Sequence, residues 1–255
     1  MDPDRAAVSR MLAAAGCIAP DAEADALFAA ADGDATLLAD LVARRRAGEP
    51  IAWLVGAVTF CNVTVTVAPG VYVPRPQTEP LARRAASLLP ADGLAVDLCT
   101  GSGAIAAVLS AAAPGARVVA TELEETAVGC ARRNDVEVFA GFLDDPLPAT
   151  FERRVDVMTA VVPYVPTDEL RLLPRDVQIY EPRLALDGGA DGIDLLAEVV
   201  RRSPRWLRPG GWLLLELGGE QAATIGHMLR AMGLDDAEVL TDDEGAPRAI
   251  CARLR

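Results

Sequence analysis

The chain has 255 residues, of which 51% are hydrophobic, and it carries a net charge of −13. This length and composition suit one large α/β domain with a small appendage. The acidic balance argues against nucleic acid as a partner, since broad phosphate binding needs a basic surplus. No apolar run is long enough to cross a bilayer, and the acidic N-terminus lacks a signal-peptide pattern. We therefore expect a cytoplasmic protein that does not bind membranes.

Residue types that are missing or rare narrow the chemistry further. The chain contains no lysine, which excludes a pyridoxal Schiff base and a P-loop lysine. The single histidine, His227, falls in a predicted helix, where we expect a surface or packing role. The cysteines are widely separated and form no C-x-x-C pair: Cys17, Cys61, Cys99, Cys130 and Cys251. We expect reduced, mostly buried thiols and no metal site.

Residues 1–56 are predicted to form a separate, all-helical N-terminal domain. The expected helices run from a cap at Asp2-Pro3 to Gly16, over 20–31, from a cap at Asp34 to 46, and over 50–55. The third helix has apolar residues at the spacing of one buried face: Leu37, Leu38, Leu41 and Val42.

Residues 57–75 are predicted to form a β-hairpin linker. Apolar residues alternate with threonines between Phe60 and Val67, with a turn at or near Cys61-Asn62. Pro69-Gly70 predicts a second turn, which is followed by a short strand at 71–73.

From residue 76 to 255, strands and helices alternate as in a doubly wound α/β domain. Strands are expected at 94–96, 118–122, 136–140, 155–162, 212–217, 237–240 and 249–254. Helices are expected up to 89 and at 106–113, 124–133, 193–202 and 221–232, with a turn at Pro209-Gly210-Gly211. The last two strands are predicted to form an antiparallel pair joined by the polar turn 242–245.

The segment Asp97–Ala106 follows the first strand of this domain and predicts a ligand site. Gly101 and Gly103 allow the backbone to bend and leave room for a ligand, and the following helix presents free N–H groups. A dinucleotide fingerprint would have glycines in place of Cys99 and Ala106. The strand-end acid and the T-G-S-G turn fit better the first motif of class I S-adenosylmethionine (SAM) methyltransferases.

Glu122 closes the second strand, about 20 residues beyond the glycine turn. An acid at this position can accept hydrogen bonds from the hydroxyls of a ribose. The pattern therefore predicts that a nucleoside-containing ligand lies over both strand ends.

Five segments carry a more specific resemblance, in register between residues 48 and 221. They are Gly48-Glu49-Pro50-Ile51 with Gly56 and Phe60, the stretch Pro69–Glu79, Asp97–Ala106, the stretch Glu181–Gly192, and Pro209-Gly210-Gly211 with Glu216 and Gln221. Together they resemble the HemK/PrmC family of protein-(glutamine-N5) methyltransferases, which modify the Gly-Gly-Gln motif of peptide-chain release factors.

The resemblance implies a class I SAM-methyltransferase fold, with a Rossmann-like seven-stranded sheet preceded by a small helical domain that helps to bind the release factor. It implies SAM as the cofactor and a protein glutamine amide as the methyl acceptor. The residues aligned with the cofactor site are Arg75, Thr78, Asp97, Cys99, Thr100, Gly101, Ser102, Gly103, Glu122, Phe142 and Leu143. For Arg75 and Thr78, a role near SAM, a role near the peptide and a purely structural turn all stay open.

The chain departs from the family in the segment that binds the acceptor. The family has N-P-P-Y there, and the aligned catalytic residues here are Val161, Val162, Pro163 and Tyr164. In the family, the Asn oxygen and the next carbonyl accept hydrogen bonds from the amide and orient its poorly nucleophilic nitrogen. Val161 has no acceptor, whereas Val162 keeps its carbonyl and Tyr164 can pack on a planar substrate.

A second departure lies after the third strand, where Phe142 aligns with the acid usual in the family. Three interpretations stay open: Phe142 or Leu143 packs on adenine, Asp144 replaces the acid, or Phe142 only packs. A third departure is Cys99, a small side chain in place of glycine that leaves room for SAM.

Three functions stay open at this point. The chain methylates glutamine in a protein such as a release factor, it methylates a small-molecule substrate at N or O, or it binds SAM without catalysis. The last two are motivated by Val161, because an amine, hydroxyl or carboxylate acceptor needs no amide clamp.

Overall fold

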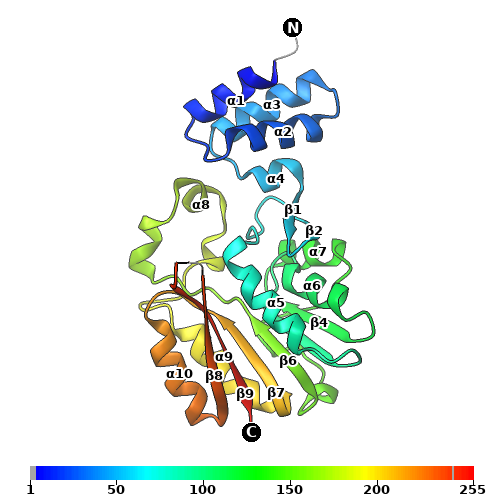
Figure 1. Cartoon of the computed structure of the whole chain (residues 1–255), viewed down its shortest axis with the longest axis vertical. Coiled ribbons are helices and arrows are strands. Elements are labelled where there is room, and N and C mark those ends of the chain that lie inside the picture. The colour runs from blue at the N-terminus through cyan, green and yellow to red at the C-terminus, as the bar shows by residue number, and fades with distance from the viewer. Residues whose placement is uncertain (1–3, 243) are drawn as a thin grey trace.

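The structure is a computed structural model and describes residues 4–242 and 244–255. The chain begins with α1 (Arg5–Ala14), α2 (Pro20–Ala31), α3 (Ala35–Arg46) and α4 (Ile51–Val55). These helices share a hydrophobic cluster of their own, which includes Leu12, Leu27 and Leu41. Figure 1 shows them above the sheet as a distinct group, which we call the helical head (residues 4–56).

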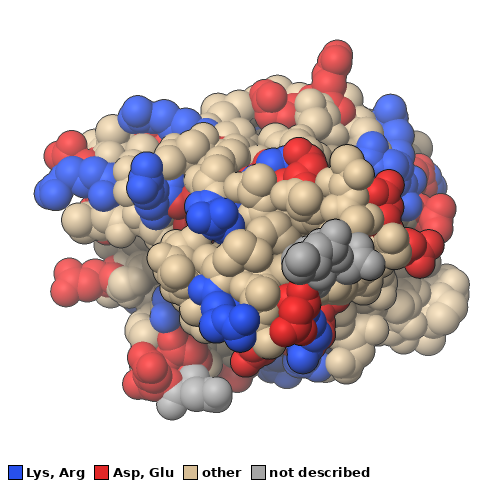
Figure 2. Space-filling model, turned by 90° about the horizontal axis from the view of Figure 1, so that it is seen from above, with Lys and Arg blue, Asp and Glu red and all other residues tan. Residues whose placement is uncertain are grey.

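Polar contacts fix the helix ends of the head. The Asp34 carboxylate accepts the N–H groups of Thr36 and Leu37 at 2.8 and 3.0 Å, as the predicted cap requires. The cap predicted at Asp2-Pro3 lies outside the described residues. On the face seen from above the head, arginine and acidic side chains are interspersed (Figure 2).

The predicted hairpin is present as β1 (Ala57–Phe60) and β2 (Val63–Thr66), which pair antiparallel. Cys61 and Asn62 occupy its two-residue turn with φ of 49° and 65°. The prediction of a strand at 71–73 is wrong. The Val71 carbonyl accepts the Trp53 indole N–H at 3.0 Å, and the Val71 N–H bonds to Ala68, so no sheet partner is used.

A seven-stranded sheet forms the centre of the described chain. Its strands are β3 (Leu94–Leu98), β4 (Arg117–Glu122), β5 (Glu137–Ala140), β6 (Val155–Ala160), β7 (Leu207–Glu216), β8 (Leu234–Thr241) and β9 (Pro247–Leu254). Their spatial order is β5-β4-β3-β6-β7-β9-β8. Strands β3 to β7 run parallel, and β9 runs antiparallel to both of its neighbours. This order confirms the predicted class I methyltransferase sheet.

Helices cover both faces of the sheet (Figure 1). On one face lie α5 (Glu79–Leu88), α6 (Ala104–Ala112) and α7 (Glu125–Arg133), and on the other α9 (Asp194–Trp206) and α10 (Gln221–Ala231). Successive strand residues belong to opposite cores: Val157 packs with the first group and Met158 with the second. No helix of the described residues is both long and apolar enough to span a bilayer.

Two parts of this region differ from the prediction. Strand β7 starts at Leu207 and contains the expected 209–211 turn as a bulge, because the register with β6 shifts between Val155 and Val157. Between β6 and α9 the chain forms η3 (Thr167–Leu172), α8 (Arg175–Tyr180) and η4 (Arg183–Ala185). We call residues 165–186 the roof segment. It meets the head where the Tyr180 hydroxyl donates to the Ala47 carbonyl at 3.3 Å.

Candidate active site

A cavity of about 670 Å³ lies at the carboxyl ends of the parallel strands, where the strand order reverses between β3 and β6. Open α/β sheets bind their ligands at this reversal. Residues of the roof segment, such as Pro174 and Leu184, also line the cavity, and so does Ile18 from the head. One cavity is therefore bounded by three separate parts of the chain.

The cavity brings together all but one of the site residues predicted from the sequence. Those that line it are Arg75, Thr78, Asp97, Cys99, Thr100, Gly101, Ser102, Glu122, Phe142, Leu143, Val161, Val162, Pro163 and Tyr164. Gly103 does not line it. A Cβ on Gly103 would approach Val136 Cγ2 to 2.8 Å, so this glycine lets the chain pack closely behind the turn and makes no room for a ligand.

Asp97 is the penultimate residue of β3 and carries a buried carboxylate, with 1% of the residue exposed. It accepts hydrogen bonds from the hydroxyls of Thr100 at 2.5 Å and Thr159 at 2.6 Å. Burial raises the pKa of Asp97 to about 6, and the two hydroxyls oppose this rise. Near neutral pH the cavity therefore holds a buried negative charge beside the glycine turn.

Glu122 is held by backbone groups from two loops. Its Oε2 accepts the Gly101 N–H at 2.8 Å, and its Oε1 accepts the N–H groups of Leu123 and Glu124 at 2.7 and 3.0 Å. A carboxylate has about four acceptor sites, so one remains for a ligand hydroxyl in a fixed direction. This geometry suits the predicted contact with a ribose.

Further groups around the turn fit SAM. The Ser102 hydroxyl is buried without a hydrogen-bond partner among the described residues, which leaves it for a ligand. Cys99 adopts φ of 54°, and burial raises the pKa of its thiol, so this side chain is neutral. These groups fit the parts of SAM. The carboxylates of Asp97 and Glu122 and the Ser102 hydroxyl suit its ammonium and sugar, and the apolar side chains of Phe142 and Leu143 suit its base. The described residues contain no cluster able to hold a metal ion.

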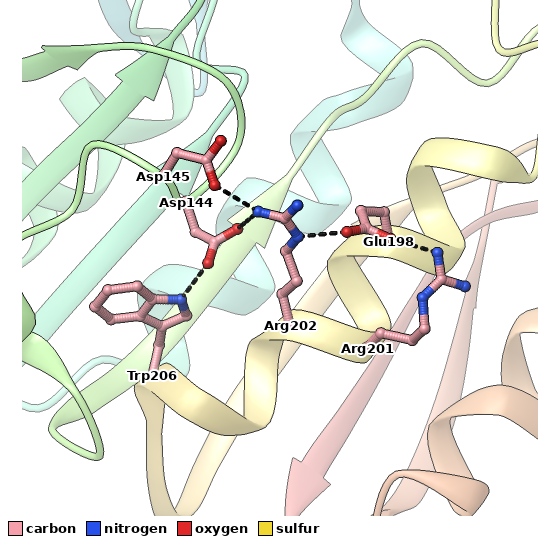
Figure 3. Close-up of polar contacts among 6 residues, drawn as sticks. All are labelled: Asp144, Asp145, Glu198, Arg201, Arg202 and Trp206. Carbon is pink, nitrogen blue, oxygen red and sulfur yellow. Dashed lines mark hydrogen bonds and ion pairs between the residues drawn. The ribbon is translucent and has the colours of Figure 1, made fainter.

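Asp144 does not take the place of the missing acid, so that interpretation of the sequence is wrong. Its Oδ2 accepts the Trp206 indole N–H at 2.7 Å and its Oδ1 accepts Arg202 at 3.0 Å, as Figure 3 shows. Both oxygens are used on α9, and Asp144 does not line the cavity. Phe142 and Leu143 do line it and are the residues that can contact a base.

The acceptor side of the cavity is formed by the segment after β6. Val161 is half-buried and packs on the apolar core of the α5–α6 face. Its side chain has no atom that can accept a hydrogen bond. The Tyr164 hydroxyl donates to Glu216 Oε1 at 2.9 Å, and the Tyr164 carbonyl accepts Gln221 Nε2 at 2.9 Å. Tyr164 is therefore bonded at its hydroxyl to the last residue of β7 and at its carbonyl to the first residue of α10.

Arg75 is the last residue of the predicted linker, and Thr78 follows it closely in the chain. The Arg75 guanidinium pairs with Glu181 and lies 5.0 Å from the centre of the Tyr72 ring. Thr78 is buried, and its hydroxyl has no partner within the described chain.

Sequence reasoning missed several residues of the cavity, including Tyr72, Arg248 and the roof segment. It noted Glu216 only as part of a family match. Its place at the end of a strand next to β6 is a signal that could have identified it, because parallel strand ends share one edge of a sheet.

Comparison with known proteins gives relatives along most of the chain. None of the protein-family models that were compared matches the chain. The release factor glutamine methyltransferase of Geobacter sulfurreducens is 38% identical over 220 residues, which cover 84% of this chain and 76% of that protein. The protein of the same name from Mycolicibacterium smegmatis is 36% identical over 268 residues, covering 96% and 95%. A solved methyltransferase from Pyrococcus furiosus shares the fold, with a TM-score of 0.53 at 19% identity over 74% of this chain and 87% of that one.

Proposed function

Because the chain belongs to the release factor glutamine methyltransferase family, we propose that it methylates the side-chain amide of a glutamine within a release factor. SAM is the cofactor of this family and supplies an electrophilic methyl group on a sulfonium. One observation carries the proposal: a single cavity joins the carboxylates of the glycine turn to the acceptor segment after β6.

On the cofactor side, we assign each group by its chemistry. Asp97 binds the ammonium of SAM, because a buried carboxylate attracts a cation strongly. Glu122 accepts from the ribose, and Phe142 and Leu143 flank the adenine. The remaining residues of the turn hold the backbone close to the cofactor.

On the acceptor side, the Val162 carbonyl accepts one N–H of the glutamine amide, and Tyr164 packs on its plane. These contacts orient the amide nitrogen before reaction, which is needed because its lone pair is delocalised. We further propose that residues 1–56 form a domain that helps to bind the release factor, with 57–75 as linker and 76–255 as catalytic domain. A release factor as partner also implies a cytoplasmic location, since translation ends there.

The test is methyl transfer from labelled SAM to a purified release factor. Mass spectrometry of the digested product should locate the methyl group on the glutamine of the Gly-Gly-Gln motif. A release factor with that glutamine replaced by alanine is the matched control. Lack of transfer at near-stoichiometric enzyme would overturn the proposal.

Val161 favours a second candidate, a small-molecule acceptor. An amine, hydroxyl or carboxylate does not need two fixed acceptors, and Val161 offers none from its side chain. Calorimetry with SAM followed by transfer assays on these three classes tests this candidate. SAM binding with transfer to a small molecule and none to the release factor would favour it.

A further inference from the structure

Glu216 is a buried carboxylate on the acceptor side of the cavity. It ends β7, lines the cavity, and is 3% exposed. Because Ala160 pairs with Leu215, the residues that follow them, Val161 and Glu216, lie side by side at this edge of the sheet. The family's polar residue is missing at 161, and a stronger hydrogen-bond acceptor stands on the adjacent strand.

One oxygen of this carboxylate lacks a partner. Oε1 accepts from the Tyr164 hydroxyl at 2.9 Å, whereas Oε2 is buried without a hydrogen bond to any described residue. A buried acceptor without a donor is costly, so the site is incomplete without a ligand.

The nearby cations do not complete it. Arg75 pairs with Glu181, and Arg248 donates to Asp242 through Nε at 2.7 Å. Burial raises the pKa of Glu216, while the hydroxyls of Thr78 and Tyr164 and the charges of Arg248 and Arg75 oppose the rise. The carboxylate is thus surrounded by polar groups, yet no cation of the described residues bonds to it.

Thr78 supplies a second unpartnered group in the same cavity. It ends η1 (Pro76–Thr78), it is buried, and its hydroxyl oxygen has no hydrogen-bond partner among the described residues. This hydroxyl lies beside Glu216 and lowers the pKa of that carboxyl, but the two side chains are not in hydrogen-bonding geometry. A hydroxyl donates as well as accepts, so the pair offers one donor and one strong acceptor.

We propose that Glu216 and Thr78 hold the carboxamide of the acceptor glutamine, in place of the asparagine that the family has at position 161. Glu216 Oε2 accepts one amide N–H and the Val162 carbonyl accepts the other. The Thr78 hydroxyl donates to the amide oxygen. This inference rests on the proposed function and names the residues that recognise its acceptor.

The arrangement also explains how the chain tolerates Val161. A carboxylate is a stronger hydrogen-bond acceptor than a carboxamide. It also places negative charge beside a nitrogen that becomes more positive during methyl transfer. The Tyr164 hydroxyl fixes the direction of the carboxylate through its other oxygen.

The first test measures binding, independently of turnover. A Gly-Gly-Gln peptide is titrated by calorimetry into the protein saturated with S-adenosylhomocysteine, the demethylated cofactor. Glu216→Ala should weaken peptide binding roughly 10- to 100-fold, and Thr78→Val should weaken it roughly 3- to 10-fold. Affinity for SAM should stay unchanged. Glu137→Gln, at an exposed carboxylate of β5, is the matched control.

The second test is rescue and pH dependence. Adding Val161→Asn to the Glu216→Ala variant should raise its peptide affinity at least about tenfold. The same substitution in the native chain should change peptide affinity little. Glu216→Gln keeps the volume of the side chain and serves if the alanine variant folds poorly. Peptide binding by the native chain should weaken as pH falls and Glu216 becomes protonated, and Glu216→Gln should lack this dependence.

The outcomes separate this inference from the proposed function. If the native chain methylates the Gly-Gly-Gln peptide but Glu216→Ala and Glu216→Gln bind it as the native chain does, the inference is wrong and the proposed function stands. If the native chain neither binds nor methylates the peptide or the release factor, both are wrong. Equal losses of peptide and SAM binding in Glu216→Gln would also overturn the inference, since they would indicate a structural role.

Discussion

The carboxylate of Glu122 accepts the backbone N–H of Gly101 at 2.8 Å and thereby joins the ends of β4 and β3. Glu122→Ala removes this bond and the proposed contact with the ribose. We expect SAM affinity to fall roughly 10- to 100-fold, because each charged hydrogen bond contributes about 1.5–3 kcal/mol. Calorimetry measures the loss, and Glu125→Gln, at an exposed acid of α7, is the control. Unchanged affinity in Glu122→Ala would contradict the assignment.

Asp97 should make folding stability depend on pH. Burial raises its pKa to about 6 from an ordinary 3.8, so the folded state binds a proton more tightly than the unfolded state. This group therefore lowers stability as pH rises from about 4 to 6, on the order of 3 kcal/mol in total. Asp97→Asn should lose this pH dependence and should be more stable than the native chain above pH 6. Urea unfolding at pH 4 and 7 measures the difference, with Asp92→Asn as the exposed control.

The same carboxylate should make SAM binding depend on pH. Protonation of Asp97 removes the negative charge proposed to bind the SAM ammonium, so affinity should decrease as pH falls below about 6. Asp97→Asn should bind SAM weakly and with little change over this range. Parallel pH profiles for the two proteins would show that another group controls binding.

Asp144 should contribute to stability and not to cofactor binding. Asp144→Ala leaves the buried Trp206 indole N–H without its acceptor and removes one partner of Arg202 (Figure 3). We expect a loss of about 2–4 kcal/mol in the free energy of unfolding and unchanged SAM affinity. Asp144→Asn keeps an acceptor for Trp206 and should lose less. A tenfold loss of SAM affinity at unchanged stability would restore Asp144 as a cofactor residue.

Gly192 should control the position of the acceptor segment. It adopts φ of 72°, and a Cβ there would lie 2.0 Å from the Tyr164 carbonyl oxygen, so Gly192→Ala must displace that residue. We expect kcat to fall by about tenfold or more, since misplaced positioning groups are costly, while SAM affinity stays unchanged. Gly233→Ala has a similar φ of 77° but open space around it, and it separates backbone strain from displacement. Equal effects of the two variants would contradict this explanation.

The sheet and the cofactor side of the site were predictable because their signals are local. The alternation of strands and helices and the T-G-S-G turn depend on neighbours a few residues away, and Glu122 is identified by its place at the end of the next strand. The order of the strands then follows from the family pattern and is confirmed in the structure. The predicted cavity-lining residues come together because parallel strand ends share one edge of the sheet.

The parts that could not be predicted depend on distant partners. The apolar segment 71–73 resembles a strand, but its backbone bonds to the Trp53 side chain instead of a sheet. Asp144 follows β5 as a cofactor acid would. Its carboxylate instead accepts hydrogen bonds from Trp206 and Arg202, about 60 positions later in the chain. The unpartnered oxygen of Glu216 likewise follows from the pairing of both nearby arginines elsewhere, which no sequence spacing indicates.

The reversal of strand order between β3 and β6 bears on how such a protein can diverge over evolutionary time. The groups proposed to bind the methyl donor lie in or directly after β3, β4 and β5. Those proposed to bind the acceptor follow β6 or end β7, except Thr78, which comes from η1. Mutations in the second half of the sheet can therefore change which methyl acceptor is bound while SAM binding is kept.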